Sequence, residues 1–405
     1  MYTSSYKRLR GRIFYWLFEV VRTLNLPLPP IQNPCTLVAD SPGTGILKAG
    51  PIVKDTSTAE ETGTTYPYFN HRAYQAEGRW SRRTFVGKWR RLGGHDPLWR
   101  PPPPSVLRRT LSELKPVCLW LEALPKDPTF RGSSFEVPVA TAAVQQDAQN
   151  PDTGYLTLLQ FANDRDTLYA LLEHLSETLR PHGIRTLTGP THLLPHLGGG
   201  ALSSHWQLPP PTDTPYNPPY VSEHLDALTS PVDTLSLFHF ETRVEKSPTE
   251  GAVVLQALEP RHLPNTLPLL QTACSATTLS PPDAAEVQAI LRWLEPRQPF
   301  GFFATLPGAP ETPVGFALLY PDSVPRAGLR RARARTGRLL GGVLPDARRQ
   351  GVGRTLLSAA LKEARTRGWD SVSVGPVSQK GDAAAFLEAC GGVRQQGYTL
   401  YKTKL

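Results

Sequence analysis

The segment from Gly341 to Gly375 constrains the fold of this 405-residue chain more than any other. An apolar run over 339–344 leads into it, with the length of a β-strand, and ends at Pro345. Proline cannot donate to a strand ladder, so a central strand stops there. After a turn, apolar residues recur on one face of a predicted helix that ends near Gly368. They are Leu356, Leu357, Ala360, Leu361 and Ala364. This order predicts an α/β fold.

The turn between strand and helix has the composition of an anion site. Gly351 and Gly353 allow backbone N–H groups to approach a ligand closely, and the first turn of a helix leaves N–H donors unpaired. Arg348, Arg349 and Arg354 add positive charge at the same point. These features together predict that the turn binds a diphosphate group.

Two common diphosphate motifs do not fit this turn. The third glycine of a dinucleotide-binding GxGxxG fingerprint would fall at Leu356. No Gly-Lys-Ser/Thr sequence follows, so the turn is not a P-loop.

The pattern V-x-P-x-x-R-x-x-G-x-G-x-x-L-L does fit, and it strongly resembles the acetyl-CoA loop of the GNAT N-acetyltransferase superfamily. It is met by Val343, Pro345, Arg348, Gly351, Gly353, Leu356 and Leu357. In that family the backbone after the fourth strand holds the CoA pyrophosphate, and the strand edge binds thioester and pantetheine. The resemblance implies acetyl-CoA as acyl-donor substrate, with no metal. It also implies as contacts Val343, Leu344, Arg348, Arg349, Gln350, Gly351, Val352, Gly353, Arg354 and Thr355.

An earlier part of the chain repeats this order of elements. A strand over 155–161, a helical face over 168–179, Gly183 and Gly189-Pro190 parallel the later strand, helix, Gly368 and Gly375-Pro376. The earlier turn reads Ala-Asn-Asp-Arg-Asp over 162–166, where two carboxylates replace the glycines. Such a turn would repel a diphosphate. We therefore expect one CoA site per chain, carried by a fragment from about residue 245 onward.

The predicted fold class is α/β with mixed sheets, as two GNAT-like domains in tandem. We expect a largely disordered extension over 1–80, a degenerate GNAT-like domain over 81–245 and the acetyltransferase domain over 246–405. The DPLWRPP sequence at Asp96 and the Pro-Tyr-Asn-Pro segment at 215–218 resemble bacterial tandem GNAT-like proteins. The prolines and aromatic residues there either fix an inter-domain loop or form an apolar trough for a substrate.

Composition limits the compartment and the partners. Four widely spaced cysteines without a CxxC pair indicate a reducing, cytoplasmic setting and no zinc site. The net charge is +9, and basic and aromatic residues alternate from Trp80 to Arg100. That stretch could serve single-stranded nucleic acid, but we prefer a surface helix. The apolar run within 7–28 is too short to span a bilayer. No firm nucleic-acid or membrane partner is predicted.

The catalytic groups are where the chain departs from the resemblance. Many GNAT enzymes carry on the last helix a tyrosine that protonates the leaving thiolate, and Leu387 takes that place here. Tyr398 and Tyr401 are candidate substitutes, although strand alternation favours packing for both. No carboxylate base lies within 338–344. The acid and base stay unassigned.

Two functions fit these features. The first is an acyl-CoA-dependent N-acyltransferase whose acceptor is a small-molecule or peptide amine. The second is a non-catalytic CoA- or acyl-CoA-binding sensor or scaffold protein.

Overall fold

The computed structural model describes residues 69–96, 98–125, 137–243, 253–258, 267–273, 278–322 and 335–405. All of them belong to one compact unit, residues 47–405. Residues 1–68 of the predicted disordered extension lie outside the described residues, whereas residues 69–80 lie within them. Residues 69–75 form a strand, so the first domain begins earlier than the predicted residue 81. No helix among the described residues is long and apolar enough to cross a membrane.

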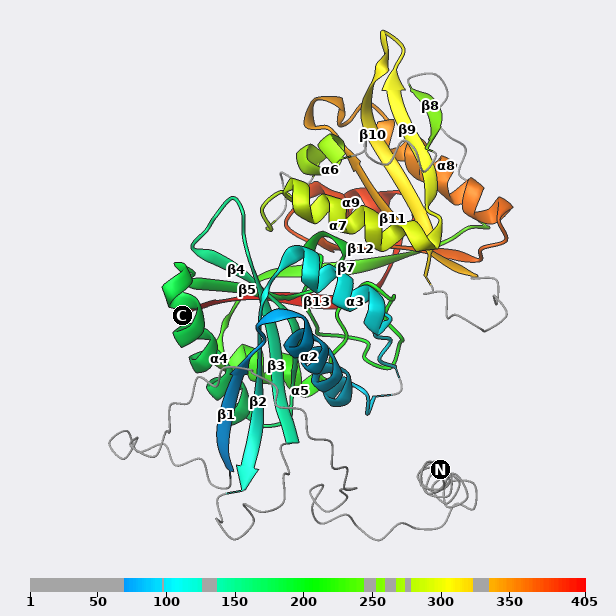
Figure 1. The fold of residues 1–405 in the computed structure, drawn as a ribbon. Helices are drawn as coiled ribbons and strands as arrows, with labels where there is room; N and C mark the ends of the chain where they lie inside the picture. Colours follow the sequence, from blue (N-terminus) through cyan, green and yellow to red (C-terminus); the bar gives the residue numbers. More distant parts are fainter. Residues whose placement is uncertain are drawn as a thin grey trace, which may run out of the picture. The chain divides into compact units, whose positions relative to one another are not determined.

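The first module runs from β1 to β7 and alternates strands with helices on the pattern of the predicted domain (Figure 1). Its main elements are β1 (Phe69–Gln75), α2 (Gly78–Gly93), α3 (Pro104–Leu114), β2 (Val117–Pro125), β3 (Val137–Gln146), β4 (Thr153–Phe161), α4 (Arg165–Leu179), β5 (Thr186–Thr191), β6 (Ala201–Leu202), α5 (Pro219–Leu228) and β7 (Ser230–Glu241).

The second module, β8 to β13, repeats this order, so the tandem arrangement is confirmed. Its elements are β8 (Val254–Leu258), α6 (Leu267–Ala273), α7 (Ala284–Leu294), β9 (Phe300–Leu306), β10 (Ala309–Pro321), β11 (Thr336–Val343), α8 (Val352–Thr366), β12 (Ser371–Ser378), α9 (Asp382–Ala389) and β13 (Val393–Lys404). In both modules the Gly–Pro bond after the helix and strand is cis, at Gly189-Pro190 and Gly375-Pro376.

The two modules exchange their last strands. The sheet order is β1-β2-β3-β4-β5-β13-β7-β12-β11-β10-β9-β8 (Figure 1). Strand β13 of the second module lies beside β5 of the first, where Tyr401 pairs with Gly189. Strand β7 of the first module lies beside β12 of the second, where Phe240 pairs with Val372. The fifth strand of each module, β5 or β12, therefore pairs with a strand that the other module supplies.

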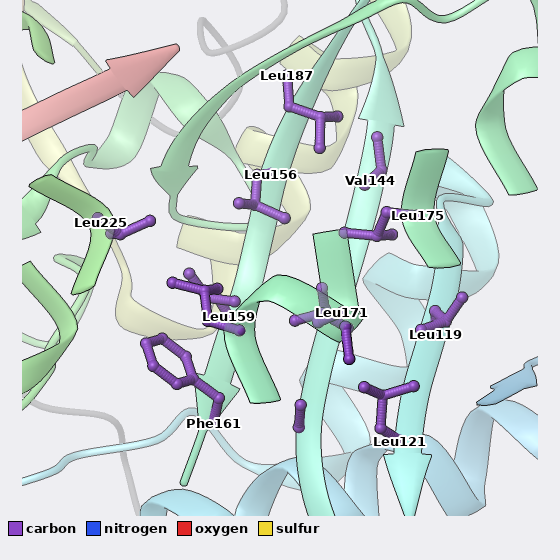
Figure 2. Close-up of a cluster of buried hydrophobic side chains, with 14 of the residues drawn as sticks. Leu119, Leu121, Val144, Leu156, Leu159, Phe161, Leu171, Leu175, Leu187 and Leu225 are labelled. Carbon is purple, nitrogen blue, oxygen red and sulfur yellow. The ribbon is translucent and has the colours of Figure 1, made fainter. Parts of the chain in front are cut away.

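The core of the first module forms where α4 packs on the sheet. Leu171 and Leu175 of α4 are fully buried with Leu119, Val144 and Leu156 of the strands, and Figure 2 shows these side chains clustered together. The helical face predicted from the leucine spacing is the face that is buried. Each such leucine contributes roughly 1.5–3 kcal/mol of burial free energy.

The basic and aromatic stretch forms α2, as preferred from the sequence. Its Phe85 and Trp89 are buried in a core shared with α3 and β2, and Lys88 pairs with Glu122. Trp80 stays exposed beside Arg83. The spacing of Phe85 and Trp89 thus reflects packing on the sheet.

The second module takes part of its core from the exchanged strand. Phe238 and Phe240 of β7 pack with Leu357 of α8 and Leu387 of α9. The other side of α8, including Leu356, packs over β9–β11. Helix α8, which follows the glycine turn, is therefore held in place by strands from both modules.

Candidate functional site

Strands β11 and β12 separate in the middle of the second module's sheet. They pair in parallel from Thr336 with Ser371 to Leu339 with Val374, and no described pair continues beyond that point. Both strands run on, to Val343 and Ser378. The separated part of β11 (residues 340–343) leaves one edge of backbone amides without a strand partner. Such an edge can bind an extended ligand that carries amide groups.

The direction of each amide on this edge follows from the hydrogen bond of Leu344. Its N–H donates to the carbonyl of Val314 at 2.8 Å, which makes Gly315 and Val343 a non-hydrogen-bonded pair. Because these pairs alternate along an antiparallel ladder, the N–H groups of Gly341 and Val343 point away from β10, toward the gap. The sequence assigned a donor role to the amides near Val343 and Leu344. That role is wrong for Leu344, whose N–H is already bonded.

Two glycines in β11 allow close packing next to the gap. A Cβ on Gly342 would lie 2.3 Å from Cβ of Ala273 in α6, and one on Gly341 would lie 2.9 Å from the carbonyl oxygen of Phe316. Helix α6 therefore packs closely on one face of β11 beside the separated edge. The sequence reasoning missed Ala273, although consecutive glycines in an apolar strand indicate a close backbone approach.

The predicted anion-binding turn is open at the N-terminus of α8. Gly351 is the N-cap residue, with φ of 81°, and no side chain in the described part of the chain caps the helix. A Cβ on Gly351 would meet no atom within 4 Å. Arg349, with φ of 62°, also has left-handed backbone geometry. Successive N–H groups in such a turn, with the positive end of the helix dipole, form an anion-binding site.

The arginines predicted around this turn play different parts. Arg348 is half-buried, and its Nε donates to the carbonyl of Val343 at 3.3 Å, which fixes the turn to the strand. Arg349 is 89% exposed and lies 3.7 Å from Asp382 of α9. Arg354 is exposed on the first turn of α8. Thus Arg349 and Arg354 keep their charge accessible to a ligand.

Phe386 of α9 lies at the same turn. A Cβ on Gly353 would come within 3.2 Å of the Phe386 ring, which is 36% exposed. The glycine therefore makes room for an aromatic wall beside the first turn of α8. The family resemblance pointed only to the next residue, Leu387.

The candidate acid is not at this site. The Tyr398 side chain is 0% exposed and packs with Leu202 and Leu235. Burial raises its pKa to about 12, so the hydroxyl stays protonated and is a weaker acid than an ordinary tyrosine. Leu387 is also buried, in the core with Phe238. In the described residues, neither side chain reaches the turn.

The corresponding turn of the first module is closed. The N-cap of α4 is Asp164, whose carboxylate accepts hydrogen bonds from the N–H and the hydroxyl of Thr167 at 2.9 and 2.6 Å. A side-chain carboxylate thus occupies the donors that a diphosphate would need. Strands β4 and β5 also stay paired as far as Thr157 and Thr191. This geometry supports the prediction of a single CoA site.

The loop that carries the Pro-Tyr-Asn-Pro segment joins the two modules. Asp213 accepts from the Arg297 guanidinium, and from Nε1 of Trp293 at 3.0 Å. Burial alone would raise the pKa of Asp213, but Arg297 lowers it well below the usual range. Both ion-pair partners are buried. The loop therefore fixes one module to the other, as one of the two sequence interpretations held.

Comparison with known proteins agrees with this geometry. Residues 269–391 match the model of the acetyltransferase (GNAT) family. A search of curated proteins gave no match. A tandem GNAT protein from the clavulanic acid biosynthesis pathway, solved without acetyl-CoA, has a TM-score of 0.52 and 15% identity. The alignment covers 82% of this chain and 98% of that one.

A second solved structure has a similar fold. It is the glucosamine N-acetyltransferase region of a fungal multi-domain GH3 β-N-acetylglucosaminidase, with a TM-score of 0.55 and 14% identity. It covers 83% of this chain and 38% of that one. In the described residues no group of His, Cys, Asp and Glu side chains is arranged to hold a metal ion.

Proposed function

The chain belongs to the GNAT superfamily, with two modules of that fold in tandem, and from this premise we propose that it transfers an acetyl group from acetyl-CoA to an amine. The second module carries the reaction. The acceptor is a small-molecule or peptide amine.

The observation that carries the proposal is the combination of the separated β11 edge with the uncapped turn at Gly351. The turn offers N–H donors and the charges of Arg349 and Arg354 to the diphosphate. The edge offers amides that match those of the pantetheine arm. Because the turn directly follows β11, one extended ligand contacts both features.

The same edge supplies electrostatic stabilisation for acyl transfer. An amine that attacks the thioester carbonyl produces an oxyanion, and a preorganised N–H donor lowers the barrier to it. The N–H groups of Gly341 and Val343 point into the gap, and one of them takes this part. A single such donor is worth about 2.7–4 kcal/mol in other enzymes.

A second candidate function rests on the last helix. Leu387 has no proton to give and the Tyr398 hydroxyl is buried away from the turn, so neither supplies an acid for the departing thiolate. This observation favours a protein that binds CoA or acyl-CoA without turnover. Such a protein would use the same turn and edge.

One experiment separates the two functions. Acetyl-CoA is titrated calorimetrically into the full chain, and CoA-thiol release is then followed with a panel of amino acids, polyamines, amino sugars and peptides. We expect one acetyl-CoA per chain and release that depends on the amine. Binding without release from any amine would favour the sensor. Absence of binding would refute both.

A further inference from the structure

A second concave site lies in the first module, at the end of β4 and β5. Its walls include Trp89, Trp99, Leu158, Pro190 and Tyr216. None of these residues belongs to the glycine turn or to the separated edge of the second module. The site is therefore separate from the proposed acetyl-CoA site.

A bulge in β4 shapes this cavity. Between the pairs Ala143 with Thr157 and Thr141 with Gln160, β4 contains one residue more than β3. Leu158 within the bulge has φ of 50°, in the left-handed region that leucine rarely adopts. Bulges of this kind change the direction of side chains and often lie beside binding sites. Here Leu158 and Gln160 of β4 line the cavity together with Pro190 of β5.

Several polar residues of the wall already have hydrogen-bond partners. The Asn217 side chain bonds both backbone groups of Leu202, at 2.7 and 3.2 Å. The N–H and the hydroxyl of Thr212 bond Asp322, at 2.8 and 3.0 Å. These contacts fix the loop that forms one wall, so the cavity is preformed.

Several other polar groups of the wall carry a hydrogen-bond donor that has no partner in the described residues, Nε1 of Trp89 among them. The Thr191 side chain is 3% exposed, and its hydroxyl has no hydrogen-bond partner among the residues that the structure describes. The Gln160 amide has none in the described part of the chain, and Arg100 is exposed at the cavity.

Another of these groups is His192. Its Nδ1 accepts from the N–H of Leu194 at 3.1 Å, and burial lowers its pKa to about 4. The neutral ring therefore carries its proton on Nε2.

We propose that this cavity binds a small carboxylic acid with an apolar body. Tryptophan, proline and leucine side chains cover the apolar body, while Thr191, Gln160 and Arg100 donate to the carboxylate. Anion recognition follows because hydroxyl, amide, imidazole and guanidinium donors all lie on the wall of one cavity. The carboxylate belongs either to a free acid or to the C-terminus of a peptide, since both present the same group.

The test uses the full chain and phenylacetate as the probe, with binding followed by calorimetry and ligand-observed NMR. Phenylacetamide, which has the same body without the charge, is the matched ligand. N-acetyl-Gly-Phe with a free or an amidated C-terminus distinguishes the peptide source. We expect saturable binding of phenylacetate and at least fivefold weaker binding of phenylacetamide.

Variants make the test specific. Thr191→Val should weaken phenylacetate at least fivefold while leaving the unfolding midpoint unchanged or higher, since the lost hydroxyl has no partner. Thr157→Val removes another buried hydroxyl without a partner, one outside the cavity wall, and should leave binding unchanged. Arg100→Gln should weaken binding severalfold.

Absence of saturable binding, equal affinity for the amide, or equal effects of Thr191→Val and Thr157→Val would overturn the proposal. Acetyl-CoA affinity is measured on the same samples and should not change in any of these variants. Failure of the cavity proposal therefore leaves the acetyl-CoA proposal unaffected, and the reverse holds.

Discussion

At the scale of single residues, Gly351 is the position where a side chain should affect ligand binding most directly. A glutamate there would place a negative charge in the open space above the α8 N-terminus. We expect Gly351→Glu to weaken acetyl-CoA at least tenfold, about 1.4 kcal/mol, with the fold retained. Calorimetric titration measures the change.

Gly183 provides the matched control for this substitution. It has the same φ of 81° and open space around it, but it lies in the first module. Gly183→Glu therefore imposes the same backbone strain without approaching the turn. If both variants bind acetyl-CoA as the unmodified chain does, the ligand lies elsewhere.

A second prediction at this scale concerns the buried pair of Asp213 and Arg297. Asp213→Asn would leave the Arg297 charge buried without its partner, which typically costs about 3–5 kcal/mol. Urea denaturation at neutral pH measures this loss. An equal free energy of unfolding for the two proteins would show that the pair does not stabilise the fold.

The same pair predicts a pH dependence. The pKa of Asp213 is lower in the folded chain than its unfolded value of about 3.9. Its contribution to stability is therefore present above that value and is lost as the pH falls through the folded pKa. We expect part of the acid destabilisation below about pH 4 to disappear in Asp213→Asn. Melting temperatures from about pH 2.5 to about pH 7, a range that includes the unfolded pKa, check this.

At the scale of elements, β7 stabilises a module to which it does not belong in sequence. Phe238 is 0% exposed and packs against α8 and α9. Phe238→Ala should cost about 3–5 kcal/mol and lower a single cooperative transition. Calorimetric unfolding tests this. A second transition that keeps its original midpoint would show that the modules unfold independently.

Elements defined by local pattern were predicted well, and those defined by distant partners were not. The apolar faces of α4 and α8 follow from residue spacing within a few helical turns. The pairing of β7 with β12 depends on residues more than a hundred positions apart, so no local pattern contains it.

The residues of the candidate site show the same contrast between neighbours in sequence and distant partners. The glycines and arginines of the turn were predicted because the chain holds them together in sequence. Ala273 and Phe386 come from separate helices and were missed. The bonded N–H of Leu344 could be recognised only once its ladder with β10 was known.

At the scale of the whole molecule, the exchanged strands argue against independent modules. A fragment from residue 245 lacks β7 and with it Phe238 and Phe240 of the core around α8. We therefore expect it to be insoluble or unfolded and not to bind acetyl-CoA, contrary to the expectation from the sequence. Size-exclusion chromatography and calorimetry of the fragment test this.

A two-chain version is the control for that experiment. Cutting the chain between Arg243 and Val253 and co-expressing both parts keeps every strand present. These parts should associate and bind acetyl-CoA with the affinity of the intact chain. A folded, ligand-binding fragment alone would contradict the dependence on β7.

The exchange also bears on biosynthesis. Strand β5 ends at Thr191, yet its neighbour in β13 is translated roughly 200 residues later. At about 5–20 residues per second, that interval is on the order of 10–40 s. Throughout it, the edge of β5 is without its permanent partner while the ribosome completes the second module. The nascent chain therefore exposes a strand edge that chaperones have reason to cover.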